Sequence, residues 1–182
     1  MITVRPETTD DFAAIHEVNE LAFGREVEAQ LIEALRASPE FIPELSLVAI
    51  DGDRVVGHIL FCPLAIETKD GDVPALALGV LAVRSEFQKQ GIGSRLVRDG
   101  LKRCRTLEHR IVVVVGHPEY YPRFGFSPAR ARGLEAPFPV PDEAFMVLEL
   151  APGALDAIAG MVRYPPPFEA AEADPPPQGD RL

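Results

Sequence analysis

Cysteine is scarce in this sequence, and long apolar runs are absent from it. Cys62 and Cys104 are the two cysteines among 182 residues, too few for a disulfide framework. We expect them to be small, buried apolar side chains in a reducing compartment. No apolar run approaches the roughly 20 residues of a membrane-spanning helix, and residues 1–11 lack the basic and apolar blocks of a signal peptide. A cytoplasmic protein is therefore expected.

Basic residues are also in short supply overall. The chain has 18 Lys and Arg against 28 Asp and Glu, a formal net charge of −10. This excess argues against a general nucleic-acid binder and against docking on an anionic membrane. The charge is uneven, however: residues 61–130 carry 11 basic and 7 acidic side chains, whereas residues 1–60 carry 4 and 12. The basic middle of the chain therefore predicts an anionic ligand.

Length and composition are those of one globular domain. Hydrophobic residues make up 47% and charged residues 25% of the chain, and there is no internal repeat. We expect the domain to span 1–150, with a C-terminal extension over 151–164 that packs on it and contains a small helix over 154–162. Residues 165–182 contain two Pro-Pro-Pro triplets, which predicts a flexible Pro-rich tail.

Hydrophobic periodicity predicts the element order βααβββαβαβ, an α/β fold with a mixed sheet and helices on both faces. Short apolar runs around Asp51-Gly52-Asp53 indicate a hairpin within an antiparallel meander. The run 111–115, apolar on both faces, predicts a buried strand parallel to its neighbour. The expected elements are strand 2–5, helix 9–22, a helix carrying Val27 to Leu35, strands 45–50, 54–62 and 74–83, a helix from Gly91 past Cys104, strand 111–115, a short helix 118–124 and strand 144–150.

The segment 79–94 joins an apolar strand, a short polar loop and two glycines to a helix. The free N–H groups of such a first helical turn, together with the helix dipole, form a site for phosphate. A nucleotide P-loop would need Gly-x-x-x-x-Gly-Lys-Ser/Thr, which is absent. A dinucleotide site would need Gly-x-Gly-x-x-Gly, and Leu96 stands where the third glycine should be.

Two motifs resemble the GCN5-related N-acetyltransferases (GNAT). Gln88–Gly93 matches the pattern Gln/Arg-x-x-Gly-x-Gly/Ala, the pyrophosphate-binding signature of that superfamily. Tyr121–Phe126 is similar to its Tyr-x-x-x-Gly-Phe block. The expected strand order over 1–150 matches too. Gly57-His58 and 117–121 resemble a broad bacterial branch of predicted acetyltransferases. The resemblance implies the acyl-CoA N-acyltransferase fold and acetyl-CoA as co-substrate, without a metal.

The resemblance also assigns residues to the coenzyme. It implies that the backbone of Leu81 and Val83 pairs with the pantetheine arm, as an added strand would. A backbone N–H near Leu81 or Ala82 should stabilise the oxyanion. Arg98 or Lys89 is expected to meet the adenosine phosphate. The pyrophosphate is expected on the backbone amides of Gln88, Lys89, Gln90, Gly91, Ile92, Gly93 and Ser94.

The same resemblance predicts transfer of the acetyl group to a primary amine by direct attack in a ternary complex. Tyr121 suits the general acid that protonates the departing thiolate. His117 is the candidate base, with Glu119, Glu44 and a water relay as alternatives. The acidity of 1–60 favours a cationic acceptor, with 23–26 as a wall of its cleft.

Two further readings of the sequence stay open. A non-catalytic acyl-CoA binding or sensing domain would keep the motif 88–94 without needing Tyr121. A protein-interaction module would use the prolines of 165–182. His58, inside an apolar strand, is expected to be a core histidine with hydrogen-bond partners. The sequence does not specify the oligomeric state, and a homodimer is compatible with it.

Overall fold

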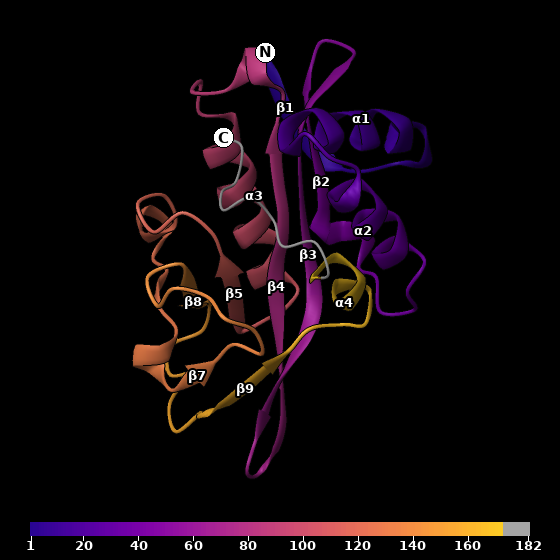
Figure 1. The fold of residues 1–182 in the computed structure, drawn as a ribbon. Coiled ribbons are helices and arrows are strands. Elements are labelled where there is room, and N and C mark those ends of the chain that lie inside the picture. Colours follow the sequence, from indigo (N-terminus) through magenta and orange to yellow (C-terminus); the bar gives the residue numbers. More distant parts are fainter. Residues whose placement is uncertain (173–182) are drawn as a thin grey trace.

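The computed structural model describes residues 1–172 and has a nine-stranded mixed sheet with helices on both faces (Figure 1). The expected mixed α/β architecture is therefore confirmed. The helices are α1 (Phe12–Phe23), α2 (Val27–Arg36), α3 (Ile92–Thr106) and α4 (Pro167–Glu172). The strands are β1 (Ile2–Pro6), β2 (Ser46–Asp51), β3 (Arg54–Thr68), β4 (Gly71–Val83), β5 (Ile111–Val115), β6 (Ser127–Pro128), β7 (Leu134–Glu135), β8 (Phe145–Glu149) and β9 (Gly160–Arg163).

The strands follow the order β1-β2-β3-β4-β5-β8-β6, with β9 joining β7 to the far end of β3. β1 to β4 form the expected antiparallel meander. β5 lies parallel to β4, because α3 carries the chain back across the sheet between them. β8 then pairs antiparallel with the whole of β5. The parallel pairing of β4 with β5 therefore lies at the centre of the sheet, and the short parallel pair of β7 with β9 lies apart from it.

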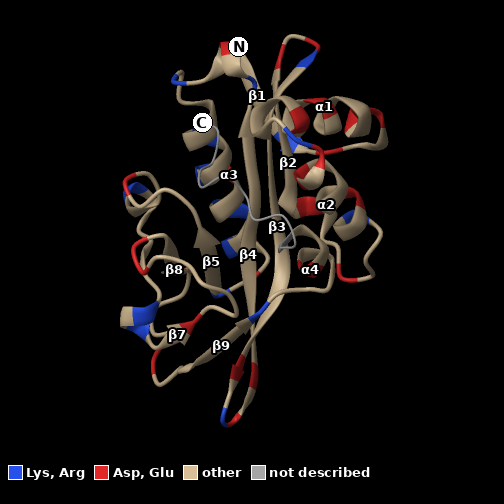
Figure 2. Ribbon diagram, in the orientation of Figure 1, with Lys and Arg blue, Asp and Glu red and all other residues tan. Residues whose placement is uncertain are grey.

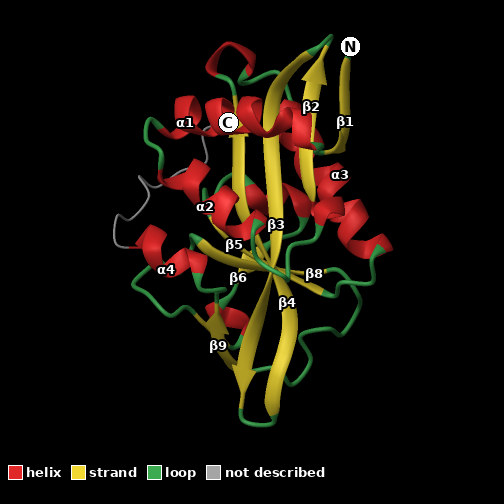
Figure 3. Ribbon diagram, turned by 90° about the vertical axis from the view of Figure 1, so that its right-hand side faces the viewer, coloured by secondary structure: helices red, strands yellow, loops and turns green. Residues whose placement is uncertain are grey.

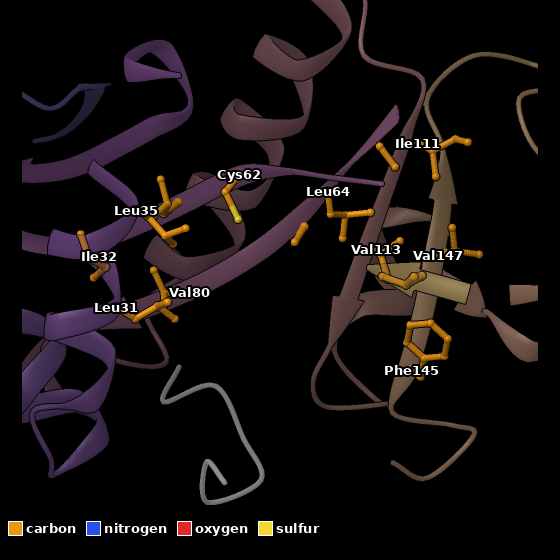
Figure 4. Packing of buried hydrophobic residues seen from close by; sticks show 14 of the residues in the cluster. Leu31, Ile32, Leu35, Cys62, Leu64, Val80, Ile111, Val113, Phe145 and Val147 are labelled. Atoms are coloured by element: carbon orange, nitrogen blue, oxygen red, sulfur yellow. The ribbon is translucent and has the colours of Figure 1, made fainter. Parts of the chain in front are cut away.

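Helices lie on both sides of the strands (Figure 3), and an apolar layer covers each face of the sheet. Leu31, Ile32 and Leu35 of α2 pack with Cys62 and Val80 in one layer (Figure 4). The apolar stripe of α3 packs in the other layer, against Phe61 and the alternate residues of the strands. Both cysteines are buried and free, as expected, and burial raises the pKa of each thiol to about 12. In residues 1–172, no helix has the length and apolar character needed to cross a membrane.

The C-terminal part differs from the sequence-based expectation. The small helix expected over 154–162 is wrong, because Gly160–Arg163 forms β9 along Ala65–Thr68 of β3. A Cβ at Gly160 would stand 2.1 Å from the carbonyl oxygen of Glu67, so only glycine allows this approach. The predicted tail includes α4, which packs on α2, while its residues 173–182 lie outside the described part. The short helix expected over 118–124 is a 3-10 turn, Tyr121–Phe124.

A buried polar chain ties α1 and α2 to the sheet. His58 is fully buried on β3; its Nδ1 accepts from Asn19 Nδ2 at 3.2 Å, and its Nε2 donates to Ser46 Oγ at 2.9 Å. Ser46 donates to Glu7 at 2.6 Å, and Arg36 of α2 binds the same carboxylate through two nitrogens. Burial lowers the pKa of His58, against the opposing effect of Glu7. The expectation of a partnered core histidine is confirmed.

This polar chain makes stability depend on pH through Glu7. Burial would raise the pKa of Glu7, but the His58 imidazole 3.7 Å away and the hydrogen bonds from Arg36 and Ser46 outweigh it and lower the pKa to about 2. Because the folded pKa lies below the unfolded value, the contribution is complete above about pH 4.5 and disappears as the pH falls towards 2. A shift of this size corresponds to roughly 3 kcal/mol at most.

We therefore predict that Glu7→Gln lowers the free energy of unfolding at pH 7 and that its difference from wild type narrows between pH 4.5 and 2. Urea denaturation at several pH values measures this difference. Glu143→Gln, at an exposed position, is the control and should leave stability nearly unchanged. A Glu7→Gln difference that stayed constant over the same pH range would contradict the depressed pKa.

Candidate functional site

The parallel junction between β4 and β5 is short, and the two strands part beyond it. The pairing comprises Leu76 with Val112 and Ala77 with Val113. β5 continues with β8 to Val115, whereas β4 continues with β3 to Val83. Each strand follows its outer neighbour, so a split opens between them at the carboxyl ends. In open α/β sheets, ligands bind at such positions.

The backbone of β4 turns specific groups towards the split. The N–H of Arg84 donates to the carbonyl of Val56 in β3 at 2.9 Å. Backbone groups of successive strand residues alternate between the two edges, so Ala82 faces β3 while Leu81 and Val83 face the β5 side. The carbonyl of Val83 accepts a bond from Gln88 Nε2 at 3.0 Å. The predicted strand-end residues thus offer a backbone edge to an extended ligand.

A β-bulge in β4 lies beside the point where the strands part. Leu60 pairs with Val80 and Phe61 pairs with Leu78, which leaves Gly79 as the extra residue. After the bulge the alternation of faces reverses: Leu78 packs in the α3 layer, and Val80 packs in the α1–α2 layer. Bulges of this kind re-aim backbone groups near functional sites. In the sequence, the glycine inside the apolar run 74–83 is the feature that could have indicated this bulge.

The loop after β4, residues 88–94, has a backbone suited to binding an anion, and we call it the cradle. Gly91, the N-cap of α3, has φ 82°, and Lys89 has φ 60°. Turns that contain left-handed residues can direct successive backbone N–H groups towards one anion. A non-glycine residue in this region stores strain, which concentrates at functional sites. The cradle and the first turn of α3 lie directly after the split edge of β4 in the chain.

Arg84 fixes the start of this loop, and sequence reasoning missed its role. Its guanidinium is buried and binds both carboxylate oxygens of Glu17 on α1, at 3.0 and 2.9 Å. Its Nε donates to the carbonyl of Val55 at 2.9 Å. The hydrogen bond with Glu17 raises the pKa of Arg84. In the sequence, the local feature that could have indicated this role is an arginine that ends an apolar strand just before a glycine-containing loop.

The second motif lies against the first turn of α3. Tyr121 is fully buried in the 3-10 turn after β5, and its ring meets the rings of Tyr120 at 5.2 Å and Phe126 at 5.6 Å. The hydroxyl of Tyr120 lies 3.3 Å from Ser94 Oγ. The structure therefore brings the two sequence motifs together through Tyr120 and Ser94, the residues next to them in the chain.

The candidate bases lie in two different parts of the structure. His117 is exposed just after β5, and its carbonyl accepts the N–H of Tyr120 at 3.1 Å. Glu119 is exposed on the same turn. Glu44 instead lines a cavity of about 320 Å³ with Lys102, Arg103 and Thr106 of α3, about three helical turns or more from Gly91. The geometry removes Glu44 from the candidate site.

Charge is distributed between the two faces (Figure 2). Basic residues follow α3; Arg98 stacks over Phe124 at 5.5 Å, while Arg95 bonds to the carbonyl of Ile2. Acidic residues gather on α1 and α2, although Glu28 is paired with Arg25 and Glu17 with Arg84. Within residues 1–172, no cluster of three or more metal-ligating side chains is found. The basic side of the molecule therefore carries the anion cradle.

Comparisons with known proteins agree with this geometry. The family model described as an acetyltransferase (GNAT) domain matches residues 3–129. The Escherichia coli protein YjhQ, an uncharacterised N-acetyltransferase, is 40% identical over 134 residues, 73% of this chain and 74% of that protein. The uncharacterised N-acetyltransferase YhbS of the same organism is 32% identical over 162 residues, 88% of this chain and 95% of that protein.

Solved structures give the same result. The crystal structure of YhbS from Escherichia coli in complex with CoA superimposes with a TM-score of 0.86 at 30% identity, covering 92% of both chains. A GNAT family acetyltransferase from Brucella melitensis in complex with acetyl-CoA gives a TM-score of 0.76 at 31% identity, covering 92% of this chain and 98% of that one. The fold, the two motifs and the relatives agree, and this chain belongs to the GNAT family of N-acetyltransferases.

Proposed function

We propose that this protein transfers the acetyl group of acetyl-CoA to a primary amine by direct attack in a ternary complex. The observation that carries the proposal is the split between β4 and β5, which lies beside the backbone cradle at the start of α3. An extended thioester ligand with a pyrophosphate group matches both features. The complexes of related proteins with CoA and acetyl-CoA support the choice of coenzyme.

The coenzyme is held mainly by backbone groups. The amides of Gln88 to Ser94 bind the pyrophosphate at the positive end of α3. The edge of β4 at Leu81 and Val83 pairs with the amides of the pantetheine arm. Because the carbonyl of Val83 already accepts from Gln88, we assign the N–H of Val83 and the carbonyl of Leu81 to the pantetheine arm. Arg98 and Lys89, both exposed, are the cations for the adenosine phosphate.

The proposed chemistry uses the backbone edge of β4 and the buried phenol of Tyr121. The neutral amine attacks the thioester carbon, a C–N bond forms, and the oxyanion takes a hydrogen bond from a backbone N–H of β4. Of the two donors expected from the sequence, Leu81 faces the split and Ala82 faces β3, so we assign this role to Leu81. The C–S bond then breaks, and the thiolate takes a proton from the phenol of Tyr121.

A base must take the proton from the attacking amine. His117 lies on the turn that joins β5 to Tyr121, and its exposed imidazole can pass a proton to solvent. We therefore assign it the role of general base. Glu119, on the same turn, is the alternative, and a mutation at each position separates them.

An acetylation panel tests the proposed activity. The purified chain is mixed with acetyl-CoA and primary amines of several classes, and the free thiol of CoA is measured. We expect thiol release that depends on the amine and equals the amount of acetylated amine formed. Tight acetyl-CoA binding without thiol release for any amine would overturn the enzyme assignment and favour a non-catalytic acyl-CoA sensor.

We predict that Gly91→Ala weakens acetyl-CoA binding. A Cβ at Gly91 meets open space, but the φ of 82° is unfavourable for alanine, at a cost of about 1–2 kcal/mol. The KM for acetyl-CoA should therefore rise roughly tenfold. Gly52→Ala is the matched control, because Gly52 also has a positive φ and open space but lies in the β2–β3 turn. An equal rise in KM for both variants would contradict a coenzyme role for the cradle.

We predict that Tyr121→Phe lowers kcat by about 100-fold while the KM for acetyl-CoA changes by less than about twofold. The substitution keeps the ring contacts of Tyr121 and removes only the proton donor. Tyr120→Phe, which removes the neighbouring hydroxyl, should lower kcat far less. Steady-state kinetics of both variants measures this difference. Wild-type turnover by Tyr121→Phe would exclude Tyr121 as the general acid.

A further inference from the structure

An aromatic side chain from the C-terminal part of the chain covers the bulge of β4. The Cζ of Phe168, on α4, lies 3.3 Å from the place where a Cβ on Gly79 would stand, and Cys62 Sγ lies 3.6 Å from the same point. Gly79 is two residues beyond Ala77, where the pairing of β4 with β5 ends. Phe168 therefore lies over the bulge on the sheet face that carries Cys62 and Val80, although it is 89 positions from Gly79 in the sequence.

Two more rings extend this surface into an aromatic wall, which we define as Phe138, Tyr164 and Phe168. The ring centroids of Tyr164 and Phe168 are 5.0 Å apart, and those of Phe138 and Tyr164 are 5.6 Å apart. These spacings are typical of interacting aromatic pairs. The rings come from the β7–β8 connection, the segment after β9 and α4, and all three are half-buried. Three separate segments thus form one aromatic cluster, and Phe168 connects it to the bulge of β4.

The aromatic wall lies on the face opposite the coenzyme cradle. Tyr164 and Phe168 pack on the core layer of α1 and α2, whereas Ile92, Tyr120 and Tyr121 pack in the α3 layer. Figure 3 shows α4 on the side of α2 and α3 on the other side of the strands. A coenzyme held at the first turn of α3 occupies the α3 face and reaches the split from there. An acceptor for direct attack must approach from the face of the aromatic wall.

We propose that the aromatic wall binds the carbon skeleton of the acceptor and that the acceptor is a primary amine with an apolar alkyl or aryl body. This inference rests on the proposed function. Ring faces bury apolar carbon and tolerate one adjacent ammonium group. Among the three side chains, only the Tyr164 hydroxyl can form a hydrogen bond, so a polyhydroxylated amine would lose the polar contacts that water gives it.

The acidic residues of α1 and α2 agree with an acceptor of low charge. Arginines neutralise the carboxylates of this region that the fold buries: Glu7 binds Arg36, Asp11 binds Arg5, and Glu28 binds Arg25. The acidity of residues 1–60 is therefore partly internal to the fold. It does not by itself call for a polycationic acceptor.

Competition between amines of equal charge tests the aromatic wall. The ratio of kcat/KM for 2-phenylethylamine to kcat/KM for ethanolamine is measured for wild type, Phe168→Ala and Phe168→Leu, with hexylamine and glucosamine as a second pair. Phe12→Ala is the matched control. Phe12 is also half-buried, but it lies on α1 and its ring packs under Arg36 of α2. The KM for acetyl-CoA is measured in parallel and reports whether each variant keeps its coenzyme site.

We expect wild type to prefer the apolar amine of each pair. Phe168→Ala should reduce this preference about tenfold, and Phe168→Leu, which keeps the packing of α4, should reduce it less, with the KM for acetyl-CoA unchanged. Phe12→Ala should keep the wild-type ratio. The inference would be overturned if Phe168→Ala turned over both amines of a pair with the wild-type preference for the apolar one. It would also be overturned if wild type preferred glucosamine to hexylamine. Absence of turnover with every amine would instead overturn the proposed function.

Discussion

Backbone pairing at the centre of the sheet is the constraint on which the rest of this structure depends. β4 and β5 share two residue pairs before β4 follows β3 and β5 follows β8. Satisfied hydrogen bonds on the outer edge of each strand hold the strands apart, because breaking them would leave buried backbone groups without partners. The split is thus a property of the whole sheet, and a ligand can complete its inner edge without moving the protein backbone.

The surroundings of the split are fixed by long side-chain ties. Arg84 connects the end of β4 to α1 through Glu17, and Tyr120 connects the turn after β5 to Ser94 on α3. Beneath α1 and α2, the chain from Asn19 through His58 and Ser46 to Glu7 and Arg36 holds the helices to the sheet. These contacts pre-organise the loop 84–94 and the tyrosine turn, which is what a backbone-based coenzyme site requires.

The C-terminal part completes the opposite face. β9 continues the sheet beside β3, and α4 places Phe168 over Gly79. Because Gly79 has no side chain, an aromatic ring from a distant segment can lie against the bulged strand. The two faces of the sheet therefore differ: the basic face with α3 carries the cradle, and the face with α1, α2 and α4 carries the aromatic wall, so the proposed function brings the two substrates together from opposite faces.

The sequence alone determined the local features of this protein. Periodicity and turn residues identified the meander, the buried strand 111–115 and the three main helices, and the spacing of Gly91 and Gly93 located the cradle. Such features depend on residues close together in the chain. The tertiary structure decided the split, the register shift at Gly79, the pairing of β9 with β3, and the contacts of Arg84 and Phe168. Each of these depends on which distant segment lies alongside, and an apolar run looks the same in sequence whether its edge is paired or left open to a ligand.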